Sequence, residues 1–389
     1  MLQNSTFTTS ETKSLAARLN RYAVVAVFLA LIALPAVWFG RTSFAPAPLH
    51  ENRKMSPAPA LSIHLFQETD RWFSDRFGMR DALVYYGSRL QMARTGTPSN
   101  QDVVIGPSKW LFYDQYYVPG RPHFADTLGK DPLSASQLRL ATDNVIQADR
   151  ALAACGIPFY FVVAPDKQAI YPEKLGIHIP ADAKSNADQL IESLRTAAPA
   201  LKIIDLRGVV QNAKAQAPYD LYMRTDTHWN SLGAFYGYQA IMQRLAADRV
   251  ASPSRWTQLS NWTVTQAKFD KGDIAVNLLS LPGYFEDYAP RFKRQPERQA
   301  VWQGDELAGS STNAAGKGHL VMYRDSFAAE LLPFLGEDFA TTWSALGREL
   351  DGDAIAQQHP NVVMLEIVAR NIRMLKEPPV NMDRLCRKT

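Results

Sequence analysis

The segment Arg224–Gly233, RTDTHWNSLG, places an acid and an imidazole two residues apart. Thr225 and Thr227 favour extended backbone, in which residues i and i+2 share a face. Asp226 can then hold His228 in one tautomer and stabilise its charged form, as a general base requires. By itself the same spacing is also typical of a surface or capping histidine with an acid nearby.

A helix is predicted directly after this pair. Residues 231–248 carry apolar side chains at helical spacing, and Asn230 or Ser231 is a good N-cap. The positive end of that helix opposes a charge on His228, whereas Asp226 favours it. This balance predicts a base that works near neutral pH.

The sequence HLVMYRDSFAAELL supplies a candidate nucleophile. It predicts a strand that ends near Tyr323 and a helix that begins at Phe327. Ser326 then stands at the carboxyl end of a parallel strand, where α/β folds place ligands, and its backbone N–H points to where an oxyanion forms. A strand–Asp–Ser–helix junction is also an ordinary helix cap. Together, the two segments predict a nucleophile, a base and an orienting acid.

Alternating strands and helices must bring these segments together. The predicted strands are short apolar runs at 158–165, 202–206, 319–323 and 361–368. The predicted helices cover 134–154, 184–198, 231–248 and 327–335. Strands without polar alternation, separated by helices, indicate an α/β fold whose mostly parallel sheet is covered on both faces.

Other regions read less regularly. Residues 64–90 predict two short helices broken near Gly78, and the runs DVVIG and WLFYD predict a hairpin or bend around Pro107. Residues 250–315 are rich in Pro, Gly, Trp and Asn, which favours an insertion or long loop region.

The N-terminus predicts a membrane anchor. Residues 22–40 are uncharged and long enough to span a bilayer. A cleaved signal peptide is the alternative, but Pro46 and Pro48 follow the small-residue sites and disfavour cleavage. The basic residues before the span outnumber Arg41 after it, a weak bias towards a cytoplasmic lead. The segments expected are a lead (1–21), the span (22–40), a tether with helices (41–98), the catalytic domain (99–372) and a tail (373–389).

Composition excludes some classes of protein. The 389 residues carry a net charge of +4 without a basic block, so no nucleic-acid partner is expected. No HxH or HExxH pattern occurs, so neither a metal nor another cofactor is expected. Cys155 and Cys386 can pair in an oxidising compartment, although their spacing alone does not establish a bond.

The segment YMRTDTHWNSLGAFYGY resembles the D-x-H-W signature of the alginate O-acetyltransferases of the AlgJ/AlgX type, which belong to the SGNH-hydrolase superfamily, and RDSF resembles their nucleophile segment. Further segments resemble the family in its own order: 51–59, 73–83, 103–113, 163–175 and 360–370. The resemblance implies a flavodoxin-like three-layer SGNH fold in which Asp226 and His228 precede Ser326 as a triad. The present sequence departs from many members of that family at position 324, where it has Arg324 and they carry glycine.

The same resemblance implies what the chain does. The family acetylates an exported polysaccharide outside the inner membrane, with a membrane-bound O-acyltransferase as acetyl supplier. A chain that ends soon after its last strand resembles the anchored, single-domain AlgJ arrangement, with the catalytic domain in the periplasm. A carbohydrate acetylesterase with the same triad, and a non-catalytic subunit of an export complex, are the alternatives.

Additional residues near these motifs are candidates for binding. Trp229, Tyr222 and Tyr171 either stack on sugar rings or belong to the core. Lys167, Arg224 and Arg370 either meet uronate carboxylates or are ordinary charges. Arg324 either narrows the oxyanion site or contacts the substrate, and only the amide of Ser326 is expected as an oxyanion donor.

Overall fold

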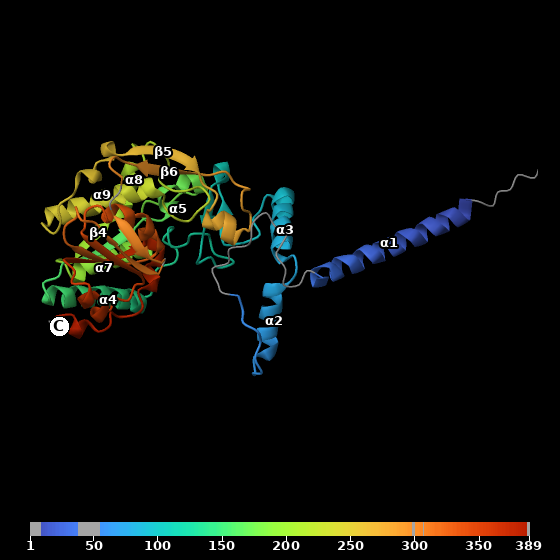
Figure 1. Cartoon of the computed structure of the whole chain (residues 1–389), viewed down its shortest axis with the longest axis horizontal. Coiled ribbons are helices and arrows are strands. Elements are labelled where there is room, and N and C mark those ends of the chain that lie inside the picture. The colour runs from blue at the N-terminus through green and yellow to red at the C-terminus, as the bar shows by residue number, and fades with distance from the viewer. Residues whose placement is uncertain (1–8, 38–54, 298–299, 306, 387–389) are drawn as a thin grey trace, which may run out of the picture. The chain divides into compact units, whose positions relative to one another are not determined.

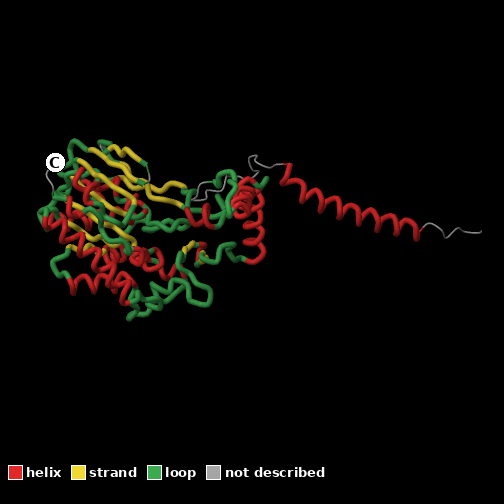
Figure 2. Tube along the Cα trace, turned by 90° about the horizontal axis from the view of Figure 1, so that it is seen from below, coloured by secondary structure: helices red, strands yellow, loops and turns green. Residues whose placement is uncertain are grey.

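The structure, a computed structural model, describes residues 9–37, 55–297, 300–305 and 307–386. Its contacts divide the chain into two compact units. The first comprises residues 1–99 with 279–282, and the second comprises 100–278 with 283–389. The helices α1 to α3 belong to the first unit, whereas every strand belongs to the second (Figure 2).

In the described residues of the first unit, the helices are α1 (Thr9–Val37), α2 (Leu65–Arg76) and α3 (Arg80–Thr95) (Figure 1). The predicted break near Gly78 is confirmed, because Met79 takes a left-handed conformation between α2 and α3. The predicted membrane segment 22–40 falls on α1 up to residue 37, and the remaining part lies outside the described residues. Over the described ranges, no helix combines the length and the apolar character that a membrane crossing needs.

A seven-stranded sheet organises the second unit, in the order β4-β3-β11-β9-β10-β8-β7. Five neighbouring strands are parallel. Four of them were predicted, namely β4 (Lys202–Asp205), β3 (Phe159–Ala164), β11 (Val362–Val368) and β9 (His319–Arg324), whereas β10 (Thr341–Leu346) was not. Strand β8 (Ala308–Thr312) pairs antiparallel with β10, and the edge strand β7 (Val301–Gly304) pairs antiparallel with β8, so the sheet is mixed.

Helices cover both faces of this sheet (Figure 1). One face packs against α4 (Ala135–Ala154) and α7 (Asn186–Ala197), and the other against α8 (Leu206–Ala213) and α9 (Ser231–Ala247). Strand β3 shows why its sequence is apolar throughout: Tyr160 and Val162 enter one core while Phe161 and Val163 enter the other. Each such side chain stabilises the fold by about 1.5–3 kcal/mol.

Shorter elements complete the second unit. The hairpin predicted around Pro107 is present as β1 (Val103–Ile105) and β2 (Leu111–Tyr113). Further helical segments are η1 (Pro107–Lys109), α5 (Lys167–Ile170), α6 (Pro172–Leu175), η5 (Ser326–Glu330), α10 (Leu332–Leu335), α11 (Gly352–Gln357), η6 (Ala369–Met374) and η7 (Met382–Arg384).

The region 250–315 is more ordered than its sequence predicted. It contains a hairpin of β5 (Thr263–Lys268) and β6 (Tyr288–Lys293), the short helices η2 (Arg255–Thr257), η3 (Leu259–Asn261) and η4 (Ile274–Leu278), and both antiparallel sheet strands. Strands β8 (AGSST) and β7 (VWQG) are short and contain small or polar residues rather than a continuous apolar run. Periodicity therefore does not mark them.

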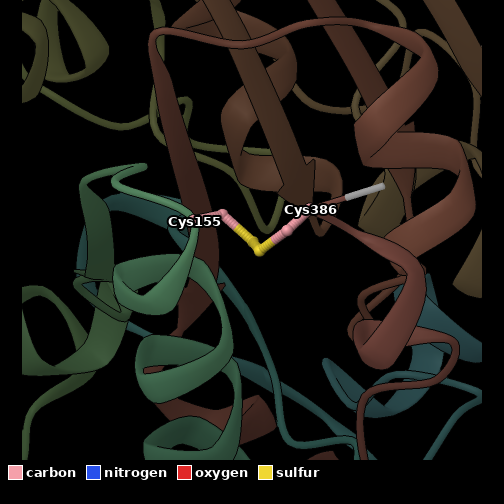
Figure 3. Close-up of a disulfide and its surroundings, with 2 residues drawn as sticks. All are labelled: Cys155 and Cys386. Carbon is pink, nitrogen blue, oxygen red and sulfur yellow. A yellow bond between two sulfur atoms is a disulfide. The ribbon is translucent and has the colours of Figure 1, made fainter. Parts of the chain in front are cut away.

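A disulfide joins Cys155 to Cys386, with their Cα atoms 5.3 Å apart (Figure 3). Cys155 is the residue that ends α4, and Cys386 lies shortly after η7. The bond therefore ties the C-terminal segment to the helix layer, a pairing that sequence spacing had left open.

Candidate active site

Four segments converge at the carboxyl edge of the parallel strands. The chain leaves β3 towards Lys167, β9 towards Ser326 and β11 towards Arg370. The loop 221–230, which joins the region after α8 to α9, contributes the fourth segment. This edge is where α/β folds assemble their sites, because the strand ends leave room between loops.

Three side chains from two of these segments form a hydrogen-bonded line. His228 Nε2 lies 2.7 Å from Ser326 Oγ, and His228 Nδ1 lies 2.7 Å from Asp226 Oδ1. Ser326 is exposed, His228 is half-buried and Asp226 is buried. The geometry suits a hydroxyl that reaches solvent, a ring that can take its proton, and an acid shielded from water.

The loop reaches this geometry by a different route from the predicted one. Residues 224–228 form bends rather than extended backbone. Asp226 Oδ1 accepts from the backbone N–H of His228 at 2.9 Å as well as from its ring, which makes an Asx-turn. Asn230 is the N-cap of α9, and its side-chain oxygen accepts from Leu232 N and Gly233 N. The spacing was informative, but the turn rather than a strand brings the acid to the imidazole.

The nucleophile segment is fixed by a buried acid. Asp325 caps η5 by accepting from Phe327 N at 2.9 Å. Its other oxygen accepts from Val368 N at 2.8 Å, at the end of β11, and from the Asn371 side-chain amide at 3.0 Å, in η6 directly after that strand. Ser326 therefore follows a residue that joins the ends of two neighbouring parallel strands.

Burial and charge shift the pKa values of the site in opposite directions. Burial disfavours the Asp226 carboxylate, but the hydrogen bond and charge of His228 hold the pKa of Asp226 below its usual range. Burial also disfavours a charged His228, yet the hydrogen bond and charge of Asp226, with the charge of Asp273, raise the pKa of His228. Burial and the nearby Asp325 raise the pKa of Glu366 well above its usual range.

Asp273 is a site residue that sequence reasoning missed. It lies in the irregular region, just before η4, and its Oδ2 is 3.6 Å from His228 Nδ1. Its backbone N–H donates to Asp226 Oδ2 at 2.9 Å. The sequence signal was faint: the glycine before it allows a close backbone approach, because a Cβ on Gly272 would lie 2.5 Å from the Thr225 carbonyl oxygen.

Lys167 supports the base loop, residues 224–230, which carries Asp226 and His228. Its ammonium is buried and donates to three carbonyl oxygens, those of Leu111 at 2.7 Å, Arg224 at 2.9 Å and Asp226 at 2.9 Å. Burial lowers the pKa of Lys167 to about 7. The three carbonyl oxygens act in the opposite sense, because they accept from the three N–H groups of the charged ammonium and so stabilise it. Lys167 thus holds the main chain, and it is not available as the substrate ligand considered from sequence.

The predicted arginines differ in position. Arg370 is mostly buried, donates to Asp166 at 2.7 Å and lies over the ring of Phe327 at 5.0 Å. Arg324 is buried and donates to Ser344 Oγ at 3.0 Å and to the Asp325 carbonyl at 3.2 Å. Arg324 also lines a cavity of about 460 Å³, together with Trp302 and Pro333. Arg224 is half-buried, and its carbonyl accepts from Lys167.

The predicted sugar-stacking aromatics belong to the core. Trp229, Tyr171 and Tyr222 expose 2% of their surface or less. The Trp229 indole donates to the Phe327 carbonyl at 2.8 Å, which connects the base loop to the nucleophile segment. The Tyr222 hydroxyl donates to the Pro165 carbonyl at 2.6 Å, and the Tyr171 hydroxyl accepts from Leu221 N at 2.8 Å. Buried rings with satisfied polar groups cannot contact a sugar.

One group of donor atoms has the spacing of a cation site. Single donor atoms of Asp226, His228 and Asp273 lie within 4.8 Å of one another. Both ring nitrogens of His228 are already engaged by Asp226 and Ser326, however. We therefore treat this group as a hydrogen-bonded cluster and assign it no metal.

Comparisons with known proteins place this geometry in context. The family model of the SGNH hydrolase-like domain of the acetyltransferase AlgX matches residues 103–367. The probable alginate O-acetylase AlgJ of Azotobacter vinelandii is 30% identical over 297 residues, which cover 72% of this chain and 70% of that protein. The same-named protein of Pseudomonas putida is 25% identical over 322 residues, covering 75% and 74%.

A solved structure shows a similar fold. The structure of Bacillus cereus PatB1 with a sulfonyl adduct aligns with a TM-score of 0.52 at 18% identity, over 72% of this chain and 98% of that chain. At this identity the likeness concerns the fold alone.

Proposed function

The chain belongs to the SGNH hydrolase-like acetyltransferase family of AlgX, and on this premise we propose that it is an O-acetyltransferase that acetylates hydroxyls of an exported polysaccharide, alginate or a similar polymer. The observation that carries the proposal is the line from Asp226 through His228 to Ser326, with two 2.7 Å contacts. The names of the AlgJ relatives support the acetyl group and the polysaccharide acceptor.

The first proposed step loads the enzyme. His228 Nε2 takes the proton of Ser326 Oγ, and the oxygen attacks the carbonyl carbon of an acetyl donor. Asp226 stabilises the imidazolium that results. The tetrahedral intermediate then collapses, His228 returns the proton to the leaving group, and Ser326 keeps the acetyl group as an ester.

The second step transfers the group. A sugar hydroxyl gives its proton to His228 Nε2 and attacks the ester carbonyl. The bond to Ser326 Oγ breaks, and the serine recovers its proton from His228. The Ser326 N–H, the first of η5, is the proposed oxyanion donor.

We place the catalytic unit outside the inner membrane, in the periplasm, with residues 22–40 as a single-pass anchor. The uncharged run in this segment supports an anchor. The disulfide between Cys155 and Cys386 supports an oxidising compartment. A membrane-bound O-acyltransferase that supplies the acetyl group is the proposed partner. Alkaline phosphatase fused after residue 99 tests the orientation, because it is active only where its own disulfides form.

The central experiment is an acetyl-transfer assay on the full-length chain. The donor is p-nitrophenyl acetate and the acceptor is a defined uronate oligosaccharide, with products analysed by mass spectrometry. We expect acetylated sugar from the wild type and at least a 1,000-fold loss in Ser326→Ala.

Each outcome separates the alternatives. Free acetate without acetylated sugar would identify an acetylesterase with the same triad. No acetyl product and no Ser326 adduct would favour a non-catalytic subunit. Activity that survives Ser326→Ala would refute the assignment of the nucleophile.

A further inference from the structure

Two aspartates from the region after α9 hold the base loop in the same way. Asp287 Oδ2 accepts from the backbone N–H of Thr225 at 2.8 Å and from its hydroxyl at 2.7 Å. Asp273 accepts from the backbone N–H of Thr227 at 2.7 Å and from its hydroxyl at 2.6 Å. The threonines on either side of Asp226 are thus each held by one carboxylate, and both bonds fix the backbone of the loop.

Only one of these two acids also faces the imidazole. Asp273 Oδ2 lies 3.6 Å from His228 Nδ1, and the Thr227 hydroxyl that it binds lies 3.2 Å from the same nitrogen. The backbone of Asp273 donates to the second oxygen of Asp226. His228 Nδ1 therefore has two carboxylates beside it, one in direct hydrogen bond and one at ion-pair distance.

The backbone around Asp273 is built for this approach. Gly272 lies against Thr225 so closely that an added Cβ would be 2.2 Å from its hydroxyl oxygen. The next turn is joined to the same residue, because Ala275 N donates to the Thr225 carbonyl at 3.2 Å. The close contact between Gly272 and Thr225 therefore helps to fix the distance between the Asp273 carboxylate and the His228 ring.

We infer that Asp273 is a positioning residue for the proposed acyl transfer, and that its carboxylate stabilises the imidazolium formed when Ser326 loses its proton. The inference rests on the proposed function. The charged groups that face His228 are Asp226 from its own loop, Asp273 from the segment before η4, and Arg370 from η6, which opposes a positive ring. The contacts from η5 are uncharged, namely the Ser326 hydroxyl and the Phe327 ring at 5.0 Å.

The sign of the expected pH effect follows from this charge. A nearby carboxylate favours the protonated ring and so raises the pKa of His228. Removing it lowers the pKa of His228, and the neutral base then persists to lower pH. The acid side of the rate profile should therefore move to lower pH, while the rate on the plateau falls because the imidazolium is less stabilised.

The test is the pH dependence of kcat/KM for p-nitrophenyl acetate with the full-length protein. In Asp273→Asn we expect the acid midpoint to fall by about one pH unit and kcat to fall about tenfold with KM little changed. Asp287→Asn is the matched control, because it loses the same kind of clamp on Thr225 without a carboxylate at His228. Its midpoint should stay at the wild-type value. Asp273→Glu, which keeps the charge, should restore most of the wild-type midpoint.

Opposite results overturn the inference. Equal midpoints in Asp273→Asn, Asp287→Asn and the wild type would make Asp273 a purely structural clamp. If Asp273→Asn does not fold, Asp273→Ser carries the same test, because it also removes the carboxylate beside His228 Nδ1. Ser326→Ala distinguishes the two proposals: if it stays active, the proposed function fails, whereas an inactive Ser326→Ala with an unmoved midpoint in Asp273→Asn refutes only the role of Asp273.

Discussion

The nucleophile segment 324–330 and the base loop 224–230 are positioned by different kinds of contact. The nucleophile follows a central parallel strand directly, and Asp325 joins that strand end to β11. The base loop has no strand of its own. Side chains from three other places hold it: Lys167, Asp273 and Asp287.

The difference shows that the sheet positions one part of the site and side-chain contacts to a loop position the other. Backbone pairing between strands places Ser326, so its position depends on the fold as a whole. Individual side chains from outside the loop place His228, so its position can be altered without disturbing the sheet. Mutations in the two regions should therefore separate loss of stability from loss of activity.

The largest effect is expected for Asp325→Asn. In the variant, an amide N–H₂ replaces one carboxylate oxygen and faces at least one of the buried N–H groups that donate to Asp325 in the wild type. At least one hydrogen bond is therefore lost, and two donors face each other. We expect the free energy of unfolding to fall by about 3 kcal/mol, and transfer activity to fall with it, because Ser326 moves. Urea denaturation and the acetyl-transfer assay measure the two effects.

Asp338→Asn is the control for that change. Asp338 is also buried and accepts from Ser254 N and the Tyr238 hydroxyl. It should lose comparable stability and keep kcat in the folded protein. A stable Asp325→Asn variant with full activity would contradict the role given to the strand ends.

A smaller effect on stability is expected for Lys167→Met. It removes the donor from three buried carbonyls of the hairpin and base loop, but it also removes a buried charge. We expect a loss of about 2 kcal/mol and a proportionally larger loss of kcat, because Asp226 is held less firmly. Thermal unfolding and kcat measured on the same samples test this.

Lys174→Met provides the comparison, since both ammonium groups lie over the Trp110 ring, that of Lys167 at 5.1 Å and that of Lys174 at 5.6 Å. It should change stability by less than about 0.5 kcal/mol. If both lysine variants behave alike, the carbonyl bonds of Lys167 are not what holds the loop.

The smallest effect should come from Trp229→Phe, which removes one of the two hydrogen bonds described between the regions and leaves the His228–Ser326 contact in place. The ring remains in the core, but the Phe327 carbonyl loses its donor. We expect about 1 kcal/mol of lost stability and a several-fold fall in kcat. Trp262→Phe loses the equivalent bond to the Trp256 carbonyl in another part of the core. An identical kcat in these two variants would show that the connection has no catalytic consequence.

The sequence predicted most of the parallel sheet because its strands are buried on both faces. Strands β3 and β11 read as continuous apolar runs, which few other structures produce. Strand β10 was missed, because its Thr and Ser residues resemble a loop although Thr342 and Ser344 are fully buried. Interior polar residues of this kind depend on neighbours that a single sequence does not reveal.

The candidate site was predictable where local rules apply. Asp226, His228 and Ser326 stand beside helix caps and strand ends, which sequence patterns mark. Asp273 was not predictable, because its contacts lie 46 and 47 residues away in a region without periodicity. The extended backbone expected at 225–228 was wrong because the Asp226 side chain, as an Asx-turn acceptor, competes with strand geometry.

The disulfide gives the chain a covalent ring that contains every residue of the proposed triad. Positions 226, 228 and 326 all lie between Cys155 and Cys386. A single proteolytic cut anywhere inside this ring leaves one molecule of unchanged mass, apart from one added water. Two fragments separate only after reduction and denaturation, so a nicked enzyme runs as intact protein on a non-reducing gel.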